Sequence, residues 1–498
     1  MRQKLGQLFQ SENGVLFLIA FVFTVAHFLT NGQYGFHRDE LATLDDARHM
    51  DWGFVAYPPL TPAFGRLSLV LFGNSLFGFR VFPTLALAVV VYVAGLIARE
   101  LGGSKRSQVL TAIAVAIIPI VSIQTNVLQY VSFDYLWGVL LTYFVLRLLN
   151  TEDPRWWVPV GAVIGLGMMT KYTMGFFVLG LAAGVFFTST RRLLLNRWLF
   201  AGVALSLIIF LPNALWQVRH DFISLDFLKH IHARDVRIGR TKGFIPEQLF
   251  VCVNTLTLPL AISGLLFYFR QRGKKYRLFG WMFVVTFVLF VIAQARSYYL
   301  GPLYPILIAA GAIAWERRLE RPWVRAVAWS LVAIGAIFSF AYFTPIAPIN
   351  SGLWNRVAKI HENYTEEIGW PQLTETVAGI YKSLPPEEQT RTGILVGNYG
   401  EAGAINTYGG KYGLPAPISG TNTNWYRTYP HPEPQTLIVI GLDDDELKED
   451  FESCTLAGHN GNPYGVKNEE SRYHSDIYVC RNLRKPWPEF WKEFRRYG

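Results

Sequence analysis

Long blocks of apolar residues alternate with short polar segments over the first two thirds of the chain. The hydrocarbon core of a bilayer is about 30 Å thick and requires roughly 20 residues of α-helix. The pattern therefore predicts a polytopic α-helical membrane protein with about eleven transmembrane helices. The predicted helices lie at about residues 14–30, 81–99, 108–124, 133–149, 157–170, 172–189, 198–216, 248–269, 279–294, 302–315 and 323–343.

Basic residues gather in the segments that join alternate apolar blocks, such as ARELGGSKRS, STRRLLLNRW, RQRGKKYR and WERRLERPW. Because Lys and Arg accumulate in cytoplasmic loops, these clusters, with Arg2 and Lys4 before the first block, predict a cytoplasmic N-terminus. An odd number of helices then places the chain after about residue 345 on the extracytoplasmic side. The formal charge of +10 reflects these orientation signals, so nucleic acid is not an expected partner.

The pattern changes after about residue 345, where polar and turn-rich sequence replaces the apolar blocks. Short apolar runs in TGILVGNYG, QTLIVIG and SDIYVC predict buried strands, and helical stretches such as LTETVAGIYKSL lie between them. We therefore expect a transmembrane domain over residues 1–344 and a small soluble extracytoplasmic α/β domain over residues 345–498. In an oxidising compartment, Cys454 and Cys480 are the only sensible disulfide pair.

The segment between the first two apolar blocks, residues 31–80, is expected to form a structured outer loop. The motif YPPL disfavours helix at Tyr57, whereas Pro59 can start a new helix. Residues 60–78 have the pattern of an amphipathic helix that lies in the membrane interface.

The same loop carries an unusual density of acids close to a membrane helix. Burying an unpaired carboxylate is costly, so we expect Asp45, Asp46 and Asp51 to be solvated residues or helix caps. Asp39 and Glu40 follow the first helix by a short distance, at the depth of lipid headgroups. We interpret this pair as reactive.

Charged and aromatic residues at the same predicted face of the membrane complete the candidate site. Asp134 stands at the start of the fourth block, which is its predicted outer end. Lys171 stands between two apolar helices, and Arg296 precedes Tyr298 and Tyr299. The loop 217–247 is rich in cations on a face that should be poor in them. These residues fit a phosphate site, although an interfacial lysine, an aromatic belt and a solvated loop are the structural alternatives.

A carboxylate facing several cations can support glycosyl transfer from a lipid phosphate. The carboxylate takes the proton from the attacking hydroxyl, and the cations stabilise the departing phosphate. The sequence contains no P-loop, dinucleotide fingerprint, HExxH motif or paired CxxC. A donor embedded in the membrane does not require a soluble nucleotide-binding fold.

Several motifs together resemble the family 39 glycosyltransferases, the protein O-mannosyltransferase-like group, and their relatives that add aminoarabinose to lipid A. The motifs are FHRDEL, YPPL, QYVSFDYLWG, GLGMMTKYT, PNALWQVRHDFISLDFL, YYLGPLYP and YGEAGAINTYGGKYGLPAPISG, which span almost the whole chain. This resemblance implies the C-type glycosyltransferase fold and a polyprenyl-phosphate sugar donor. It also implies transfer on the periplasmic side of a bacterial inner membrane, to an acceptor hydroxyl on a lipid, glycan or protein.

The resemblance also assigns roles to residues. Asp39 matches the family's catalytic acid and is expected to be the general base. The aminoarabinose transferases carry a lysine before the Pro-Pro pair, where Tyr57 stands here, which weakens the case for lipid A as acceptor. The expected catalytic residues are Asp39, Glu40 and Asp134; the expected donor-phosphate residues are Lys171, Arg219, His220, Arg296, Tyr298 and Tyr299; the expected substrate-lining residues are Tyr57, His232 and Glu401.

Two other classes of function remain open on the sequence alone. A lipid or glycan transporter or flippase would carry charged or broken helices near the bilayer midplane and repeated halves, which the sequence lacks. A non-catalytic envelope assembly protein would use Tyr399, Glu401 and Tyr408 for recognition. No cofactor is certain, and a divalent metal held by Asp39, Glu40, His220 and His232 is a further alternative.

Overall fold

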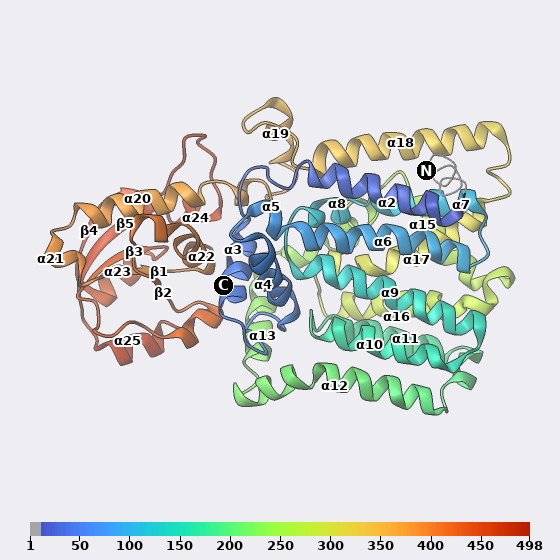
Figure 1. Ribbon diagram of the computed structural model, residues 1–498, viewed down its shortest axis with the longest axis horizontal. Coiled ribbons are helices and arrows are strands. Elements are labelled where there is room, and N and C mark those ends of the chain that lie inside the picture. The colour runs from blue at the N-terminus through green and yellow to red at the C-terminus, as the bar shows by residue number, and fades with distance from the viewer. Residues whose placement is uncertain (1–10) are drawn as a thin grey trace.

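The computed structural model describes residues 11–498. Arg2 and Lys4, on which part of the orientation prediction rests, lie outside the described residues. Figure 1 shows a bundle of long helices on one side and a part that contains the β-sheet on the other, with the short helices α3, α4 and α5 between them.

Each predicted apolar segment contains helix, so this chain is a polytopic α-helical membrane protein, as predicted. The helices are α2 (Glu12–Phe28), α6 (Val81–Glu100), α7 (Lys105–Ala116) with α8 (Pro119–Thr125), α9 (Tyr130–Thr151), α10 (Trp157–Met168), α11 (Met174–Phe186), α12 (Arg197–Arg219), α15 (Leu258–Phe269), α16 (Arg277–Ile292), α17 (Tyr304–Trp315) and α18 (Pro322–Phe343).

The apolar helices differ in length. Among residues 11–498, six helices are long and apolar enough to cross a membrane, or seven if one bent pair counts as a single span. Helices such as α2, α11 and α15 are shorter apolar helices of 10–17 residues. A straight helix of that length does not reach across a hydrocarbon core of about 30 Å.

The bent pair is α7 and α8, which meet at an angle of 62°. The break precedes Pro119, whose ring prevents the regular helical hydrogen bond. The carbonyl of Ile117 is left without its helical partner, and it accepts hydrogen bonds from Asn254 Nδ2 (3.2 Å) and Ser339 Oγ (2.6 Å). Side chains of other helices thus satisfy the backbone group that the break exposes.

The outer loop is structured, as predicted. It contains α3 (Arg38–Arg48), α4 (Leu60–Phe72) and the short α5 (Leu76–Phe79). One expectation for this loop is wrong: Asp45 and Asp46 are buried rather than solvated. The reason is a cation distant in sequence, because Arg427 contacts Asp45 and lies 3.0 Å from Asp46. Asp51 is exposed, as expected.

The C-terminal part contains a five-stranded sheet of order β2-β1-β3-β5-β4. The three predicted strands are present, and β2 and β4 were missed. Strands β2, β1 and β3 are parallel, and β3, β5 and β4 are antiparallel. The strands are β1 (Thr392–Val396), β2 (Pro417–Ser419), β3 (Thr436–Ile440), β4 (Phe451–His459) and β5 (Asp476–Leu483).

Helices cover both faces of this sheet. On one face α20 (Trp370–Ser383) and α22 (Tyr399–Tyr408) pack on Ile394 and Ile438. On the other face α25 (Trp487–Glu493) and α23 (Asp444–Asp450) pack on Leu395 and Val439. Every residue of β1 and β3 is buried, which explains why both strands appear in the sequence as continuous apolar runs.

Helix α22 also packs against α3 of the outer loop, and two glycines make the close approach possible. A Cβ atom at Gly403 would lie 2.7 Å from the backbone of Leu41, and one at Gly400 would lie 2.6 Å from Arg38 Cγ. The side chains of Leu41 and Leu44 join the same apolar cluster as the α20 face of the sheet. This contact brings the C-terminal part directly onto Asp39.

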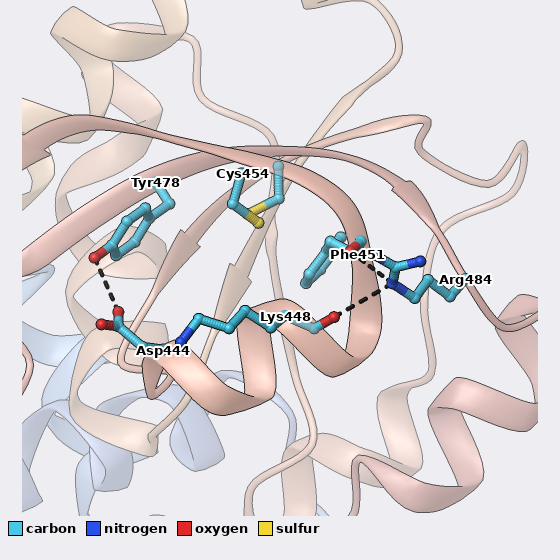
Figure 2. Close-up of a disulfide and its surroundings, with 7 residues drawn as sticks. Asp444, Lys448, Phe451, Cys454, Tyr478 and Arg484 are labelled. Atoms are coloured by element: carbon cyan, nitrogen blue, oxygen red, sulfur yellow. Dashed lines mark hydrogen bonds between the residues drawn. A yellow bond between two sulfur atoms is a disulfide. The ribbon is translucent and has the colours of Figure 1, made fainter.

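A disulfide joins the two strands at one edge of the sheet, as Figure 2 shows. Cys454 of β4 and Cys480 of β5 are direct partners in the antiparallel ladder. Beside the disulfide, the Tyr478 hydroxyl donates a hydrogen bond to Asp444 of α23 (3.1 Å). The pairing expected from the sequence is therefore present.

Candidate active site

A cavity of about 410 Å³ opens where the helical bundle meets α3 and the C-terminal part. Its walls come from the start of α9, the turn between α10 and α11, the segment before α17, and α13 (Ile223–Arg237). Tyr399 of α22 closes the side toward the sheet. Segments far apart in sequence thus share one concave site, as expected of a substrate-binding site.

Asp39 lines this cavity from the first turn of α3. The Asp39 amide donates to His37 Nδ1 (3.1 Å), which caps the helix. Its carboxylate accepts hydrogen bonds from the Tyr399 hydroxyl (2.9 Å) and from Gln129 Nε2 (2.7 Å). Even so, 43% of its side chain stays exposed, so an oxygen atom is available to a substrate.

The charges around Asp39 keep it ionised. Burial acts to raise its pKa, but His37, Arg38, the Tyr399 hydroxyl and Arg296 together outweigh burial and lower the pKa below the ordinary value. The position in the first turn of α3 acts in the same direction, because the positive end of the helix dipole favours an anion. Asp39 is therefore a carboxylate near neutral pH, which is the form that accepts a proton.

Lys171 faces the same cavity from the turn between α10 and α11. Lys171 is only 7% exposed, and its ammonium group lies 4.0 Å from the centre of the Tyr130 ring. It forms no ion pair with any residue between 11 and 498. Burial first, and then the charge of Arg296, lower the pKa of Lys171 to about 8. An unpaired, partly desolvated cation of this kind favours a bound anion.

Three arginine side chains surround one buried acid, Asp235 of α13. Its carboxylate lies 2.7 Å from Arg296 Nε, 3.5 Å from Arg234 and 3.8 Å from Arg240. All three arginines line the cavity. One carboxylate cannot neutralise three guanidinium groups, so this wall of the cavity keeps a net positive charge.

The opposite wall, toward the C-terminal part, is acidic. Arg38 contacts Glu469 and lies 3.5 Å from Glu470 and 3.9 Å from Glu366. The guanidinium also stacks over the Tyr399 ring at 5.3 Å. Because Arg38 pairs with these acids, it fixes Tyr399 and the neighbouring Asp39. The cavity is thus divided into an acidic side and a basic side.

Six predicted site residues line the cavity: Asp39, Tyr57, Lys171, Arg296, Tyr298 and Tyr299. Tyr57 donates a hydrogen bond from its hydroxyl to Asp46 (2.8 Å). The Tyr298 hydroxyl lies 2.9 Å from that of Tyr130. These contacts fix the hydroxyl groups of two of the tyrosines that line the cavity.

The structure places Glu40, one of the predicted catalytic residues, outside the lining of the cavity. Glu40 is fully buried and lies 2.7 Å from Arg80. It also accepts hydrogen bonds from the amides of Leu128 (2.8 Å) and His37 (3.0 Å). Glu40 therefore points from α3 into the protein interior, whereas Asp39 points into the cavity.

Glu401 and Asp134 are likewise outside the cavity lining. Glu401 is fully buried and caps α22 by accepting hydrogen bonds from the amides of Gly397 (3.0 Å) and Asn398 (3.2 Å). Asp134 is buried and accepts a hydrogen bond from Thr173 (3.1 Å), two residues after Lys171. Asp134 therefore supports the turn that carries Lys171 rather than touching a substrate in the cavity.

The predicted contributions of Arg219, His220 and His232 are also not found at the cavity. Arg219 and His232 are exposed, and His220 stacks on Trp216 with ring centres 3.9 Å apart. Loop 217–247 reaches the cavity instead through Arg234 and Arg240 of its helical part. Asp39, Glu40, His220 and His232 do not gather, and residues 11–498 contain no group of three or more metal-ligating side chains.

The missed residues act through partners that are distant in sequence. Arg38, Gln129 and Tyr130 lie in the motifs FHRDEL and QYVSFDYLWG, but nothing in those motifs marked them as parts of the site, and Asp235 lies in no motif. The sequence suggests Tyr399 only as a recognition residue of a non-catalytic protein. Of these, Asp235 offered a local clue, since an acid between the cations of loop 217–247 is a natural counter-ion.

The fold and the cavity together define a polytopic membrane protein of the C-type glycosyltransferase fold. Residues 56–216 match the family model described as dolichyl-phosphate-mannose-protein mannosyltransferase. This match and the fold agree with the glycosyltransferase class predicted from the sequence. No curated protein sequence matches the chain.

Solved structures of similar architecture include ArnT from Cupriavidus metallidurans bound to undecaprenyl phosphate. That structure has a TM-score of 0.60 and 16% sequence identity, and the match covers 94% of this chain and 98% of that one. The oligosaccharyltransferase from Archaeoglobus fulgidus, in complex with zinc and sulfate, has a TM-score of 0.55 and 13% identity. That match covers 86% of this chain and 68% of the other. The predicted fold is thus confirmed.

Proposed function

We propose that this protein is a glycosyltransferase that moves a sugar from a polyprenyl-phosphate donor to an acceptor hydroxyl. One observation carries the proposal. The accessible carboxylate of Asp39 and the unpaired ammonium of Lys171 face the same cavity at one end of a membrane-embedded bundle. A protein of similar fold holds undecaprenyl phosphate, which is a ligand of the chemistry that this cavity suits.

In the proposed reaction Asp39 is the general base. It accepts the proton of the acceptor hydroxyl while that oxygen attacks the anomeric carbon of the donor sugar. The bond between the anomeric carbon and the phosphate oxygen breaks, and the polyprenyl phosphate leaves with the bonding electron pair. A single displacement of this kind inverts the anomeric configuration. Hydrogen bonds from Tyr399 and Gln129 hold the carboxylate in place.

The basic wall of the cavity stabilises the leaving phosphate. Lys171 supplies an ammonium group that forms no ion pair with residues 11–498, and Arg296 supplies a guanidinium held by Asp235 at 2.7 Å. Preorganised cations stabilise the charge that develops on the phosphate without having to reorganise during the reaction. The buried position of Lys171 strengthens this interaction, because the surroundings are less polar than water.

We place the reaction on the extracytoplasmic face of a bacterial inner membrane. The basic segments 99–106, 270–277 and 317–325 lie at the end of the bundle away from the C-terminal sheet (Figure 1). Basic segments mark the cytoplasmic side, so the cavity belongs to the other side. A soluble C-terminal domain over residues 345–498 would then cover the donor site and contribute Tyr399 to it.

The test is transfer by purified protein or membranes that contain the Asp39→Asn variant. Loss of the general base is expected to lower the rate of transfer by about 10²–10⁴-fold with the thermal stability unchanged. Asp221→Asn is the matched control, since Asp221 is exposed, lies outside the cavity, and has a positive φ of 52° that asparagine tolerates. Transfer by Asp39→Asn within a few-fold of the wild-type rate would exclude Asp39 as the base.

A further inference from the structure

A second cavity, of about 630 Å³, lies in the helical bundle apart from Asp39. It is bounded by α7, α15, the end of α17 and the first half of α18. Figure 1 shows the first turn of α18 at the end of the bundle that is far from the β-sheet. The cavity is therefore separate from the donor site, and what it binds does not depend on the proposed reaction.

The walls of this cavity are apolar along most of their length. Leu256 and Leu260 line it from the α15 side, and Val327 and Leu331 line it from α18. Helix α18 is open to its surroundings along part of its length, because Val327, Ile334 and Ile337 are exposed. An apolar cavity under a lipid-facing helix suits a hydrocarbon chain.

The mouth of the cavity is strongly basic. Arg317, Arg318 and Arg321 of the turn between α17 and α18 are among the lining residues, and the lining contains no Asp or Glu. None of the three forms an ion pair with a described residue. Arg318 stacks over the ring of Trp315, which also lines the cavity, at 5.1 Å from the ring centre.

The turn that carries these arginines is fixed in place. The buried Leu319 belongs to the apolar cluster beneath the turn. Glu316, an acid in the same turn, points elsewhere and accepts hydrogen bonds from the amide of Ser104 (2.8 Å) and the hydroxyl of Ser107 (3.1 Å). Glu320, the other acid of the turn, is exposed and is not among the lining residues, so the three arginines have no acidic partner within the lining.

We propose that this cavity binds an anionic glycerophospholipid of the surrounding bilayer. Its phosphodiester would lie against the three guanidinium groups, which match phosphate oxygens in geometry and charge. One acyl chain would lie between α15 and α18. A free phosphate ion would use only the opening, and a neutral lipid would use only the walls, whereas this lipid class uses both.

The proposal is tested by native mass spectrometry of the purified full-length protein in detergent. The probes are phosphatidylglycerol and phosphatidylcholine at equal concentration. The triple variant Arg317→Gln, Arg318→Gln, Arg321→Gln is expected to lose the preference for phosphatidylglycerol. The loss should be about 100-fold, since each cation near a membrane surface contributes about a fivefold factor to the binding of anionic lipid.

The control variant neutralises three exposed cations of another turn at the same end of the bundle. Arg270, Arg272 and Lys274 are exposed, and they do not line the cavity. The Arg270→Gln, Arg272→Gln, Lys274→Gln variant should keep the wild-type preference. If both triple variants lose the preference equally, basic turns attract lipid without a specific site, and the proposal is overturned.

A separate variant tests the apolar part of the site. Ala328 lines the cavity from α18, so Ala328→Trp should fill the space and reduce phosphatidylglycerol binding while the arginines remain. Unchanged binding by this variant would show that the cavity holds no acyl chain. Displacement of bound phosphatidylglycerol by undecaprenyl phosphate at equal concentration would assign the cavity to a different lipid and would also overturn the proposal.

Discussion

Substitution of Arg80 is the most direct test of the idea that Glu40 stabilises the fold through a buried ion pair. The Arg80 and Glu40 side chains are both 0% exposed and lie 2.7 Å apart, and Glu367 lies 3.2 Å from the same guanidinium. Arg80 also donates hydrogen bonds to the carbonyls of Gly35 (2.8 Å) and Asn31 (3.2 Å). One side chain therefore joins the start of the outer loop, α3, the start of α6 and the C-terminal part.

The magnitude follows from these contacts. Arg80→Met leaves the Glu40 and Glu367 carboxylates buried without a cation, and breaking a buried ion pair in this way costs about 3–5 kcal/mol. Each carbonyl that loses its donor adds about 1–3 kcal/mol when no water replaces it. We expect a loss of about 5 kcal/mol in the free energy of unfolding. With an unfolding entropy of about 2.1 cal/mol/K per residue over 498 residues, that loss corresponds to a fall of roughly 5 °C in the unfolding temperature.

The assay is thermal unfolding of the purified protein, measured together with the transfer rate at a temperature where the variants are folded. Glu40→Gln should lose stability, and its folded fraction should transfer sugar within about threefold of the wild-type rate. The Glu40→Met, Arg80→Met double variant should be less destabilised than the sum of the two single variants by about 0.5–3 kcal/mol, because the charges are coupled. A Glu40→Gln protein with wild-type stability and a transfer rate reduced 100-fold would refute this reasoning and restore the catalytic role.

The remaining predictions concern the basic wall of the cavity. Asp235→Asn frees Arg296 from its 2.7 Å contact and loosens a cation that stabilises the departing phosphate, so kcat/KM for the donor should fall about tenfold together with kcat; a rise in KM with kcat unchanged would contradict a role in stabilising the leaving group. The pKa of Lys171 is lowered by burial to about 8, so the ammonium loses its proton as the pH rises through 8. The kcat/KM of the wild-type protein should therefore fall above pH 8, whereas Lys171→Arg, which stays charged, should not show this decline. The same alkaline decline in both proteins would assign it to another group.

Local sequence patterns were sufficient to predict the helices, the three strands β1, β3 and β5, and some of the residues that line the cavity. Asp39, Lys171 and Arg296 stood out because charged residues beside apolar helices are rare without a function. The short β2 and the largely exposed β4 were missed because neither carries a continuous apolar run.

The two misassigned acids share a physical explanation. Glu401 is the third residue of α22 and closes a capping box with Asn398, and Glu40 occupies the same position in α3 with His37. The spacing Asn-x-x-Glu before a helix is a known start signal, so the role of Glu401 could have been read from the sequence. The histidine cap of α3 is outside the usual pattern and gave no such indication.

The other errors arise from contacts that local sequence does not encode. The ion pair between Arg80 and Glu367 joins residues 287 positions apart, and the hydrogen bond between Arg427 and Asp46 joins residues 381 positions apart. Asp46 looked like a solvated acid because its cation lies in the C-terminal part. The hydrogen bond from Tyr399 to Asp39 spans 360 positions, so this part of the site required the packing of α22 on α3.

The most direct test of the central idea, that proton acceptor and donor phosphate share one cavity, is an experimental structure of the Asp39→Asn variant with a polyprenyl-phosphate sugar. The substitution should stop turnover and leave the donor intact. We expect the phosphate to lie between Lys171 and Arg296, with the anomeric carbon directed toward residue 39. A phosphate located outside this cavity, or a sugar directed away from residue 39, would contradict the account.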